Sequence, residues 1–134
     1  MRLIDVYSDK RSEDILWRLL KERTPEQSIS HKKMPKIWEH ADFFRSRPYR
    51  GWFLVEVDEY VRGAVYLSKQ REIGVFIFQD QRGHGYGRQA VQLLMQMYPG
   101  AFLANVNPVN QASQRLFESL GFRHIQNTLS LETT

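Results

Sequence analysis

The apolar positions of the first 48 residues predict one strand and then two helices. Residues 2–7 are typical of a strand, and the apolar residues that follow recur at helical spacing, at Ile15, Leu16, Leu19 and Leu20. Asp9 or Ser12 can cap this first helix, and Thr24-Pro25 ends it. Pro35 opens a second helix, whose spacing predicts a buried face made by Ile37, Trp38, Ala41 and Phe44.

The pattern changes to that of strands at Gly51. Residues 52–57 and 60–68 predict a hairpin with its turn at Asp58-Glu59. Residues 71–78 predict a third strand, and their unbroken apolar run favours a central strand that is covered on both faces. Gly74 within that run indicates a bulge or the close approach of another backbone.

The last third of the chain predicts two more helices and further strands. After a glycine-rich segment, one helical face is made by Ala90, Val91, Leu94, Met97 and Tyr98. Residues 102–106 predict a strand, residues 110–120 a short helix that Gly121 ends, and residues 122–131 a final strand or hairpin. This order predicts a mixed α/β (α+β) architecture around one sheet, in a single domain over residues 1–134.

Composition and charge narrow the function classes. The 134 residues are 42% apolar and 25% charged, as expected of a globular protein, and the absence of cysteine excludes disulfides and thiolate chemistry. The four histidines lack the spacing of metal ligands, and no apolar stretch approaches the roughly 18 residues that span a membrane. We therefore expect a cytoplasmic protein without a metal or a membrane partner. The net charge of +4 fits either a solvated basic surface or an anionic ligand, and no motif indicates nucleic acid.

A glycine-rich loop between the predicted third strand and the next helix is the first candidate site. Its sequence is Arg82-Gly83-His84-Gly85-Tyr86-Gly87-Arg88. Alternate glycines let the backbone turn its N–H groups one way, and the helix N-terminus adds a partial positive charge, which suits phosphate. By itself this loop is equally typical of a glycine-rich hairpin or linker. It lacks the Gly-Lys pair of a Walker loop and the third glycine of a dinucleotide fingerprint.

A second motif decides between these interpretations. The segment from Asn105 to Phe122 contains N-x-x-N-x-x-S and then L-F-x-x-L-G-F, downstream of R-x-x-G-x-G at Arg82–Gly87. Together the two motifs resemble the GNAT superfamily of N-acetyltransferases. The resemblance covers about residues 51–131, and the first 50 residues match only in element order. It implies a mostly antiparallel sheet, flanked by about four helices and splayed between residues 71–78 and 102–106.

The resemblance also implies a cofactor and the residues that bind it. Acetyl-CoA is the implied acyl donor, and its pantetheine arm would enter the splay beside the backbone of Val75, Phe76 and Ile77. The pyrophosphate would bind the loop, that is Arg82, Gly83, His84, Gly85, Tyr86, Gly87 and Arg88. Asn110, Ser113 and Phe117 match positions that contact the cofactor arm. The implied reaction is direct transfer of acetyl to a primary amine, of a small molecule or a peptide, by a protein that in many look-alikes is a homodimer.

The proton-transfer residues of the superfamily are missing or displaced. Phe117 stands where many members have a tyrosine acid, and a phenyl ring donates no proton. Asn105 stands where some members have a glutamate base, and Glu72 lies near another base position, where it also fits an exposed strand end. We therefore expect an acceptor of low pKa or a water relay, because deprotonating an amine of pKa about 10.4 at pH 7 costs about 4.6 kcal/mol, and one of pKa about 8 only about 1.4 kcal/mol.

Candidate acceptor residues lie in the first half of the chain. They are His31, Trp38, His40, Tyr49 and Arg50. Trp38 also fits a core position, and His31 and His40 fit a loop and a helix surface. The helix around Trp38 is weakly similar to nucleotide-amino-sugar acetyltransferases. The alternative to an enzyme is a CoA-binding regulatory module of the same fold without turnover.

Overall fold

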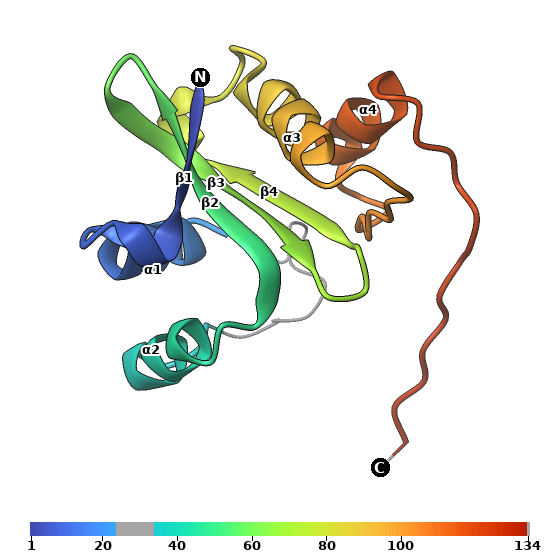
Figure 1. Cartoon of the computed structure of the whole chain (residues 1–134). Coiled ribbons are helices and arrows are strands. Elements are labelled where there is room, and N and C mark those ends of the chain that lie inside the picture. The colour runs from blue at the N-terminus through green and yellow to red at the C-terminus, as the bar shows by residue number, and fades with distance from the viewer. Residues whose placement is uncertain (24–33, 134) are drawn as a thin grey trace.

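Four antiparallel strands form one sheet in the order β1-β2-β3-β4 (Figure 1). The computed structural model describes residues 1–23 and 34–133. The strands are β1 (Arg2–Asp5), β2 (Tyr49–Val57), β3 (Tyr60–Ser68) and β4 (Ile73–Ile77). Asp58 and Glu59 make the hairpin turn between β2 and β3 with positive φ angles of 52° and 71°, as a tight turn between twisted strands requires. The predicted hairpin is confirmed.

Helices cover both faces of this sheet. One pair lies on one face and the second pair on the other (Figure 1). The first pair is α1 (Ser12–Lys21) and α2 (Ile37–Arg45), the second is α3 (Tyr86–Met97) and α4 (Gln111–Ser119), and two short 3-10 turns are η1 (Val6–Ser8) and η2 (Gln79–Gln81). No helix of the described residues has the length and apolar character needed to cross a bilayer. The prediction of a mixed α/β fold with an antiparallel sheet and four helices is confirmed.

The alternation of side chains along β2 builds two cores. Trp52 and Leu54 pack with α1 and Phe44 of α2, whereas Phe53 and Val55 pack with α3 and Phe117 of α4. Burying a side chain of this size contributes about 1.5–3 kcal/mol, so each face holds its helix pair firmly. The continuous apolar run in β2 therefore reflects burial on both faces.

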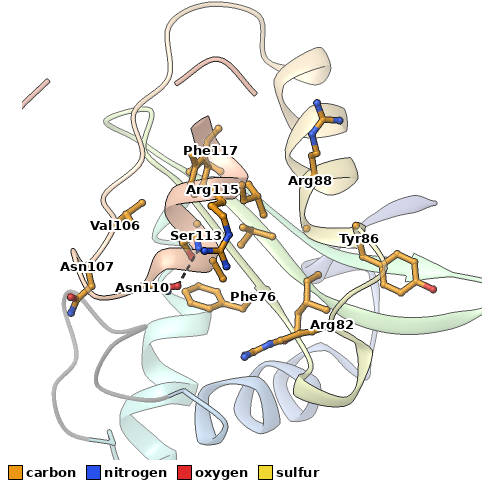
Figure 2. Close-up of a pocket in the computed structure, with 18 of the residues that line it drawn as sticks. Phe76, Arg82, Tyr86, Arg88, Val106, Asn107, Asn110, Ser113, Arg115 and Phe117 are labelled. Atoms are coloured by element: carbon orange, nitrogen blue, oxygen red, sulfur yellow. Dashed lines mark hydrogen bonds between the residues drawn. The ribbon is translucent and has the colours of Figure 1, made fainter. Parts of the chain in front are cut away.

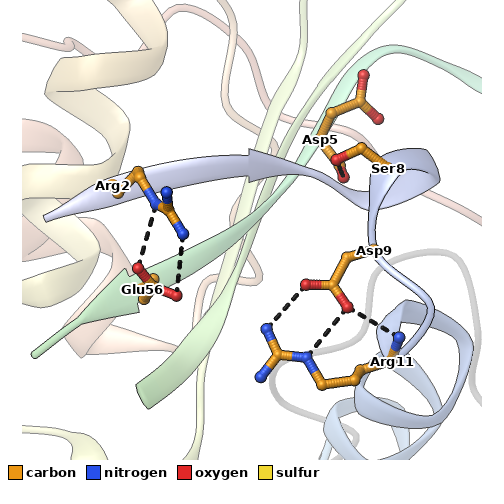
Figure 3. A network of polar contacts seen from close by, with 6 residues as sticks. All are labelled: Arg2, Asp5, Ser8, Asp9, Arg11 and Glu56. Atoms are coloured by element: carbon orange, nitrogen blue, oxygen red, sulfur yellow. Dashed lines mark hydrogen bonds and ion pairs between the residues drawn. The ribbon is translucent and has the colours of Figure 1, made fainter. Parts of the chain in front are cut away.

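Polar contacts fix the N-terminal strand and the start of α1 (Figure 3). Arg2 of β1 lies directly opposite Glu56 of β2 in the antiparallel pairing, and the two side chains form an ion pair at 3.1 Å. Asp9 accepts hydrogen bonds from the backbone N–H and the guanidinium of Arg11, and these bonds lower the pKa of the Asp9 carboxyl to about 2. Neither predicted residue is the N-cap of α1, which is Arg11 without a side-chain cap: Asp9 bonds Arg11 just before the helix, and the Ser12 hydroxyl is buried in the first turn.

The prediction for the buried face of α2 is partly wrong. Phe44 is buried, and Tyr7 donates a hydrogen bond to its carbonyl at 2.7 Å, but the side chains of Ile37 and Trp38 are 60% and 58% exposed. His40, expected on the helix surface, is buried against Trp17 of α1 at a ring distance of 5.4 Å. Because α2 is short and meets α1 through its His40–Phe44 side, its first turn stays in solvent.

Three predictions about strands are corrected by the sheet topology. β4 is an edge strand and not a central one, since its only sheet neighbour among the described residues is β3. Residues 102–106 form no strand and make one parallel bridge to β4, between Glu72 and Leu103. Residues 122–133 have no regular structure. The expected splay between two strands stays a prediction, because only one of the two strands is formed.

The close approach predicted at Gly74 involves a side chain and not a backbone. A Cβ on Gly74 would lie 2.2 Å from the ring of Tyr66, which pairs with Gly74 across β3 and β4. The Tyr66 ring stacks on Tyr49 of β2, with centroids 3.9 Å apart and planes at 7°. Glycine at this position therefore lets a tyrosine lie flat over β4.

The buried His40 gives unfolding a defined pH dependence. Burial lowers the pKa of His40 from 6.5, and its Nε2 has no hydrogen-bond partner among the described residues. Below pH 6.5 the His40 side chain binds a proton in the unfolded chain but stays neutral in the folded chain. The free energy of unfolding therefore decreases as the pH is lowered below 6.5. Denaturation by urea at about pH 7.5 and about pH 5.5 should show a larger loss for the native chain than for His40→Phe. Equal losses in the two proteins would contradict this prediction.

Candidate functional site

A cavity of about 530 Å³ lies along the free edge of β4, between that strand and α3 and α4 (Figure 2). It brings together residues that are far apart in the sequence. The following predicted catalytic and cofactor-binding residues line the cavity: Glu72, Val75, Phe76, Ile77, Arg82, Gly83, Gly85, Tyr86, Gly87, Arg88, Asn105, Asn110, Ser113 and Phe117. The glycine loop, the edge strand and α4 therefore form one site.

The hydrogen-bond pattern of β4 determines which of its backbone groups face this cavity. Ser68 donates its N–H to the Glu72 carbonyl, and Phe78 donates its N–H to the Arg62 carbonyl. Antiparallel pairing alternates along a strand, so residues 74 and 76 also direct their N–H and C=O groups toward β3. Val75 and Ile77 then direct theirs outward, as Ile73 does when it donates its N–H to Leu103 at 2.8 Å. Phe76 consequently offers the cavity its ring and not its backbone.

The glycines of the loop have two separate roles. Gly83 and Gly85 have φ angles of 87° and 77°, and no atom outside their immediate neighbours lies within 4 Å of where a Cβ would be. Gly85 is also the N-cap of α3, so the unpaired N–H groups of the first helical turn follow it directly. Gly87 is buried, and a Cβ there would lie 3.0 Å from Leu116 of α4. Two glycines thus shape an open cradle of N–H groups, and the third lets α3 and α4 pack closely.

The start of α4 forms the opposite wall of the cavity. The Asn110 side chain caps α4 by accepting a hydrogen bond from the Ser113 N–H at 3.1 Å (Figure 2). Among the described residues, none accepts a hydrogen bond from its amide N–H₂ group. Phe117, one helical turn beyond Ser113, is buried against Phe122 at a ring distance of 5.1 Å and lines the cavity.

The lining of the cavity is strongly cationic. It contains Arg23, Arg82, Arg88 and Arg115, and Glu72 is the one carboxylate among the described lining residues. Within residues 1–23 and 34–133, none of these four arginines forms an ion pair. Arg88 donates to the Ser119 hydroxyl at 3.1 Å, Arg82 donates to the Ile77 carbonyl at 3.3 Å, and Arg115 extends from α4 (Figure 2). A cavity with this balance of charge attracts an anionic ligand.

Comparison with known proteins places this geometry in a family. Residues 14–122 match the sequence profile of the Acetyltransferase (GNAT) family. The chain belongs to the GNAT acetyltransferase family. Family membership supports acetyl transfer in general and confirms the resemblance drawn from the glycine loop and the Asn105–Phe122 segment. No curated protein sequence matches the chain significantly.

Solved structures of similar fold agree with the assignment to the GNAT family. Spermidine N-acetyltransferase from Vibrio cholerae, in complex with CoA and spermine, superposes with a TM-score of 0.76 at 14% identity, over 93% of this chain and 82% of that one. An acetyltransferase from Thermus thermophilus gives 0.72 at 19% identity, over 94% and 88% of the two chains. A putative acetyltransferase from Salmonella typhimurium, solved with acetyl-CoA, gives 0.66 at 20% identity, over 90% and 77%. At these identities the likeness shows the fold alone.

Some predicted site residues of this GNAT protein lie away from the cavity. His84 is exposed at the tip of the loop and stacks near Tyr86, with ring centroids 5.2 Å apart. Trp38 is exposed beneath the Lys36 ammonium on α2, and Arg50 lies over the ring of Tyr98. Tyr49 does not line the cavity but supports Tyr66, which does. His31 falls outside the described residues.

Arg115, Tyr66 and Arg23 are among the residues with functional groups in the cavity that the sequence analysis missed. Arg115 lies on α4 two positions after Ser113, and residues two apart lie on different sides of a helix, so the spacing from Ser113 gave no signal for it. Tyr66 faces Gly74 across two strands, and only the register reveals that pairing. Arg23 follows α1 and reaches the cavity from the other face of the sheet, for which the sequence carries no signal. No group of three or more His, Asp or Glu side chains suited to a metal ion occurs in the described part of the chain.

Proposed function

We propose that the cavity binds acetyl-CoA and that the protein transfers its acetyl group directly to a primary amine. The observation that supports this most strongly is the continuity of two surfaces. The outward backbone groups of Val75 and Ile77 lead along β4 to the cradle at Gly83 and Gly85. An extended chain of amides that ends in a pyrophosphate matches both surfaces, and that is the chemistry of the pantetheine arm of CoA.

The positions of the charged residues in the cavity indicate where the pyrophosphate and the sulfur of the cofactor would lie. β4 runs toward the loop, so a pyrophosphate at residues 82–88 places the sulfur end of the arm near residues 73–75. Arg82 and Arg115 would face the phosphates, and Asn110 and Ser113 would contact the arm from α4. Each charge-assisted hydrogen bond contributes about 1.5–3 kcal/mol, so four or five suffice for roughly micromolar binding after ordering costs.

The residues near the sulfur end determine how the transfer proceeds. In this proposal the outward N–H of Val75 polarises the thioester carbonyl, as a preorganised backbone donor does. Phe117 offers no proton to the leaving thiolate. Glu72 and Asn105 both line the cavity and are the candidates for accepting a proton from the amine or for orienting a water between them.

We expect the pH–rate profile to report an acceptor of low pKa. The amine attacks as a free base, so kcat/KM should rise with pH and become flat above about pH 8.5, because an amine of pKa about 8 is then deprotonated. Release of the CoA thiol, measured from about pH 6 to about pH 11, gives the profile. A rise that continues beyond pH 10 would indicate a lysine-like amine and contradict this expectation.

A panel of amines separates transfer from simple cofactor binding. Thiol release from acetyl-CoA, measured with amino acids, polyamines, amino sugars and peptides, should show turnover with at least one class. The alternative, a CoA-binding regulatory module, is supported by the missing tyrosine at Phe117 and the missing glutamate at Asn105. It predicts that CoA raises the melting temperature while no amine in the panel releases thiol. If CoA does not raise the melting temperature and no amine releases thiol, both functions are contradicted.

A further inference from the structure

An arginine that no described residue neutralises enters the cavity from the α1 side. Arg23 lies just after α1, and its guanidinium sits 4.2 Å above the ring of Phe76. Its Nε atom is buried and has no hydrogen-bond partner among the described residues, and it forms no ion pair there. Guanidinium groups stay protonated in proteins, and burying a charge without a counter-charge is unfavourable. Such a group is suited to an anion that arrives with a ligand.

The position of Arg23 separates it from the arginines near the glycine loop. Its platform, Phe76, packs with the core under α1 and α2, whereas Val75 packs with the core under α3 and α4. Arg82, Arg88 and Arg115 belong to the loop, α3 and α4. Arg23 therefore reaches the edge of β4 from the opposite face of the sheet to the one that carries the anion cradle. The cofactor phosphates and Arg23 approach the cavity from different sides.

A tyrosine links Arg23 to the one described carboxylate of the cavity. The ring of Tyr66 lies over Gly74, which is two residues after Glu72 in the chain, and all three residues line the same cavity. Burial raises the pKa of Tyr66, while the nearby Arg23 charge lowers it and the Glu72 charge raises it. The Tyr66 hydroxyl thus stays protonated between a cation and an anion. A ligand with an ammonium group and a carboxylate would match this arrangement, with the ammonium toward Glu72 and the carboxylate toward Arg23.

We propose that the acetyl acceptor is an amine that also carries a carboxylate, and that Arg23 binds this carboxylate. The proposal rests on the proposed acetyl transfer and names the acceptor class for it. A planar guanidinium offers the parallel donors that a carboxylate accepts, and no described residue forms an ion pair with the Arg23 guanidinium. Glu72 opposes a dianionic phosphate more strongly than a carboxylate, which favours a carboxylate-bearing amine, such as a short peptide with a free amino terminus, over an aminoalkyl phosphate. Tyr66 would donate its hydroxyl proton to the same carboxylate.

Matched pairs of amines test the acceptor class. Short peptides with a free amino terminus are assayed beside their C-terminal amides and beside aminoalkyl phosphates of similar length, because a peptide amino terminus has the pKa of about 8 that the expected pH–rate profile requires. We expect a carboxylate-bearing member to be preferred over its amide by roughly 10- to 100-fold in kcat/KM, the effect of one charge-assisted pair. Arg23→Gln should reduce the ratio of the two kcat/KM values to about one. Arg23→Lys should restore the preference in part, because the charge remains and the fork is lost.

Two controls distinguish this proposal from the one on which it depends. Lys21→Gln removes one charge from the exposed side of α1, away from the cavity, and should change nothing. The Kd of acetyl-CoA should be the same for Arg23→Gln and the native chain. A Kd at least about tenfold weaker would assign Arg23 to the cofactor and overturn the proposal, as would an equal preference for amides or a preference for the phosphate. In either case acetyl transfer itself would stand.

A readout without turnover keeps the proposal testable if no acceptor reacts. The NMR signal of the Arg23 Nε–H should shift on titration with glycylglycine in the presence of CoA, and the shift should saturate. Glycylglycinamide at the same concentrations should leave the signal in place. A signal that responds to neither compound, or equally to both, would overturn the assignment of Arg23 to a carboxylate.

Discussion

Gly85→Val should weaken acetyl-CoA binding by about 100-fold, because it closes the anion cradle at the start of α3. The φ angle of Gly85 is 77°, a conformation that a β-branched residue adopts only under strain. The substituted backbone would turn away and withdraw N–H groups from the pyrophosphate. Losing one or two charge-assisted hydrogen bonds at about 1.5–3 kcal/mol each gives the expected factor. Isothermal titration with acetyl-CoA measures it.

Gly121→Val is the matched control for this variant. Gly121 also has a positive φ angle, 96°, and also has open space where a Cβ would be, but it follows α4 and does not line the cavity. Both variants should lose stability by about 1–2 kcal/mol, since both force a side chain into the left-handed region. Only Gly85→Val should lose the cofactor. Equal loss of binding in both would mean that general destabilisation, and not the cradle, is responsible.

Val75→Pro should lower kcat/KM for acetyl transfer by about 100-fold, the effect of removing one preorganised donor to the thioester. Proline lacks the N–H, and an edge strand tolerates it where that N–H would point outward. The register of β4 places the Val75 N–H on the outer edge, so the pairing with β3 should survive. The change is measured as the rate of thiol release at acetyl-CoA concentrations well below KM, where the rate reports kcat/KM.

Two further variants show whether the backbone N–H is the cause. Val75→Ala shortens the same side chain but keeps the N–H, and it should retain turnover within a few-fold of the native chain. Phe76→Pro removes an N–H that points toward β3, so it should lower the free energy of unfolding by about 1–3 kcal/mol more than Val75→Pro does. If Val75→Pro unfolds as readily as Phe76→Pro, the register argument is wrong.

The sequence predicted the elements whose pattern is local and missed the features that depend on tertiary contacts. The hairpin at Asp58-Glu59 and the helix after Gly85 follow from spacing and turn residues alone. Residues 102–106 show why a strand needs more than an apolar run. They meet β4 at one bridge only, and a segment without a partner forms no ladder. The prediction of a buried face at Ile37 and Trp38 was wrong for a similar reason, because α2 packs through His40 and Phe44 and not through its first turn.

The candidate site divides in the same way. Two contiguous sequence motifs supply one wall of the cavity. They are the glycine loop and the segment with Asn110, Ser113 and Phe117, and their residues line one cavity as expected. Arg23 and Tyr66 come from α1 and β3 and reach the cavity only through the twist and register of the sheet. A sequence pattern therefore predicts the proposed cofactor side better than the acceptor side.

Amide hydrogen exchange at β4 tests the central proposal most directly. The cavity holds CoA along the outer edge of β4 in this account, so saturating CoA should slow exchange at the Val75 and Ile77 N–H groups by at least about tenfold. Gly74 and Phe76 should change less, because their N–H groups already face β3. Unchanged exchange at Val75 and Ile77 under saturating CoA, with protection confined to other segments, would contradict the account.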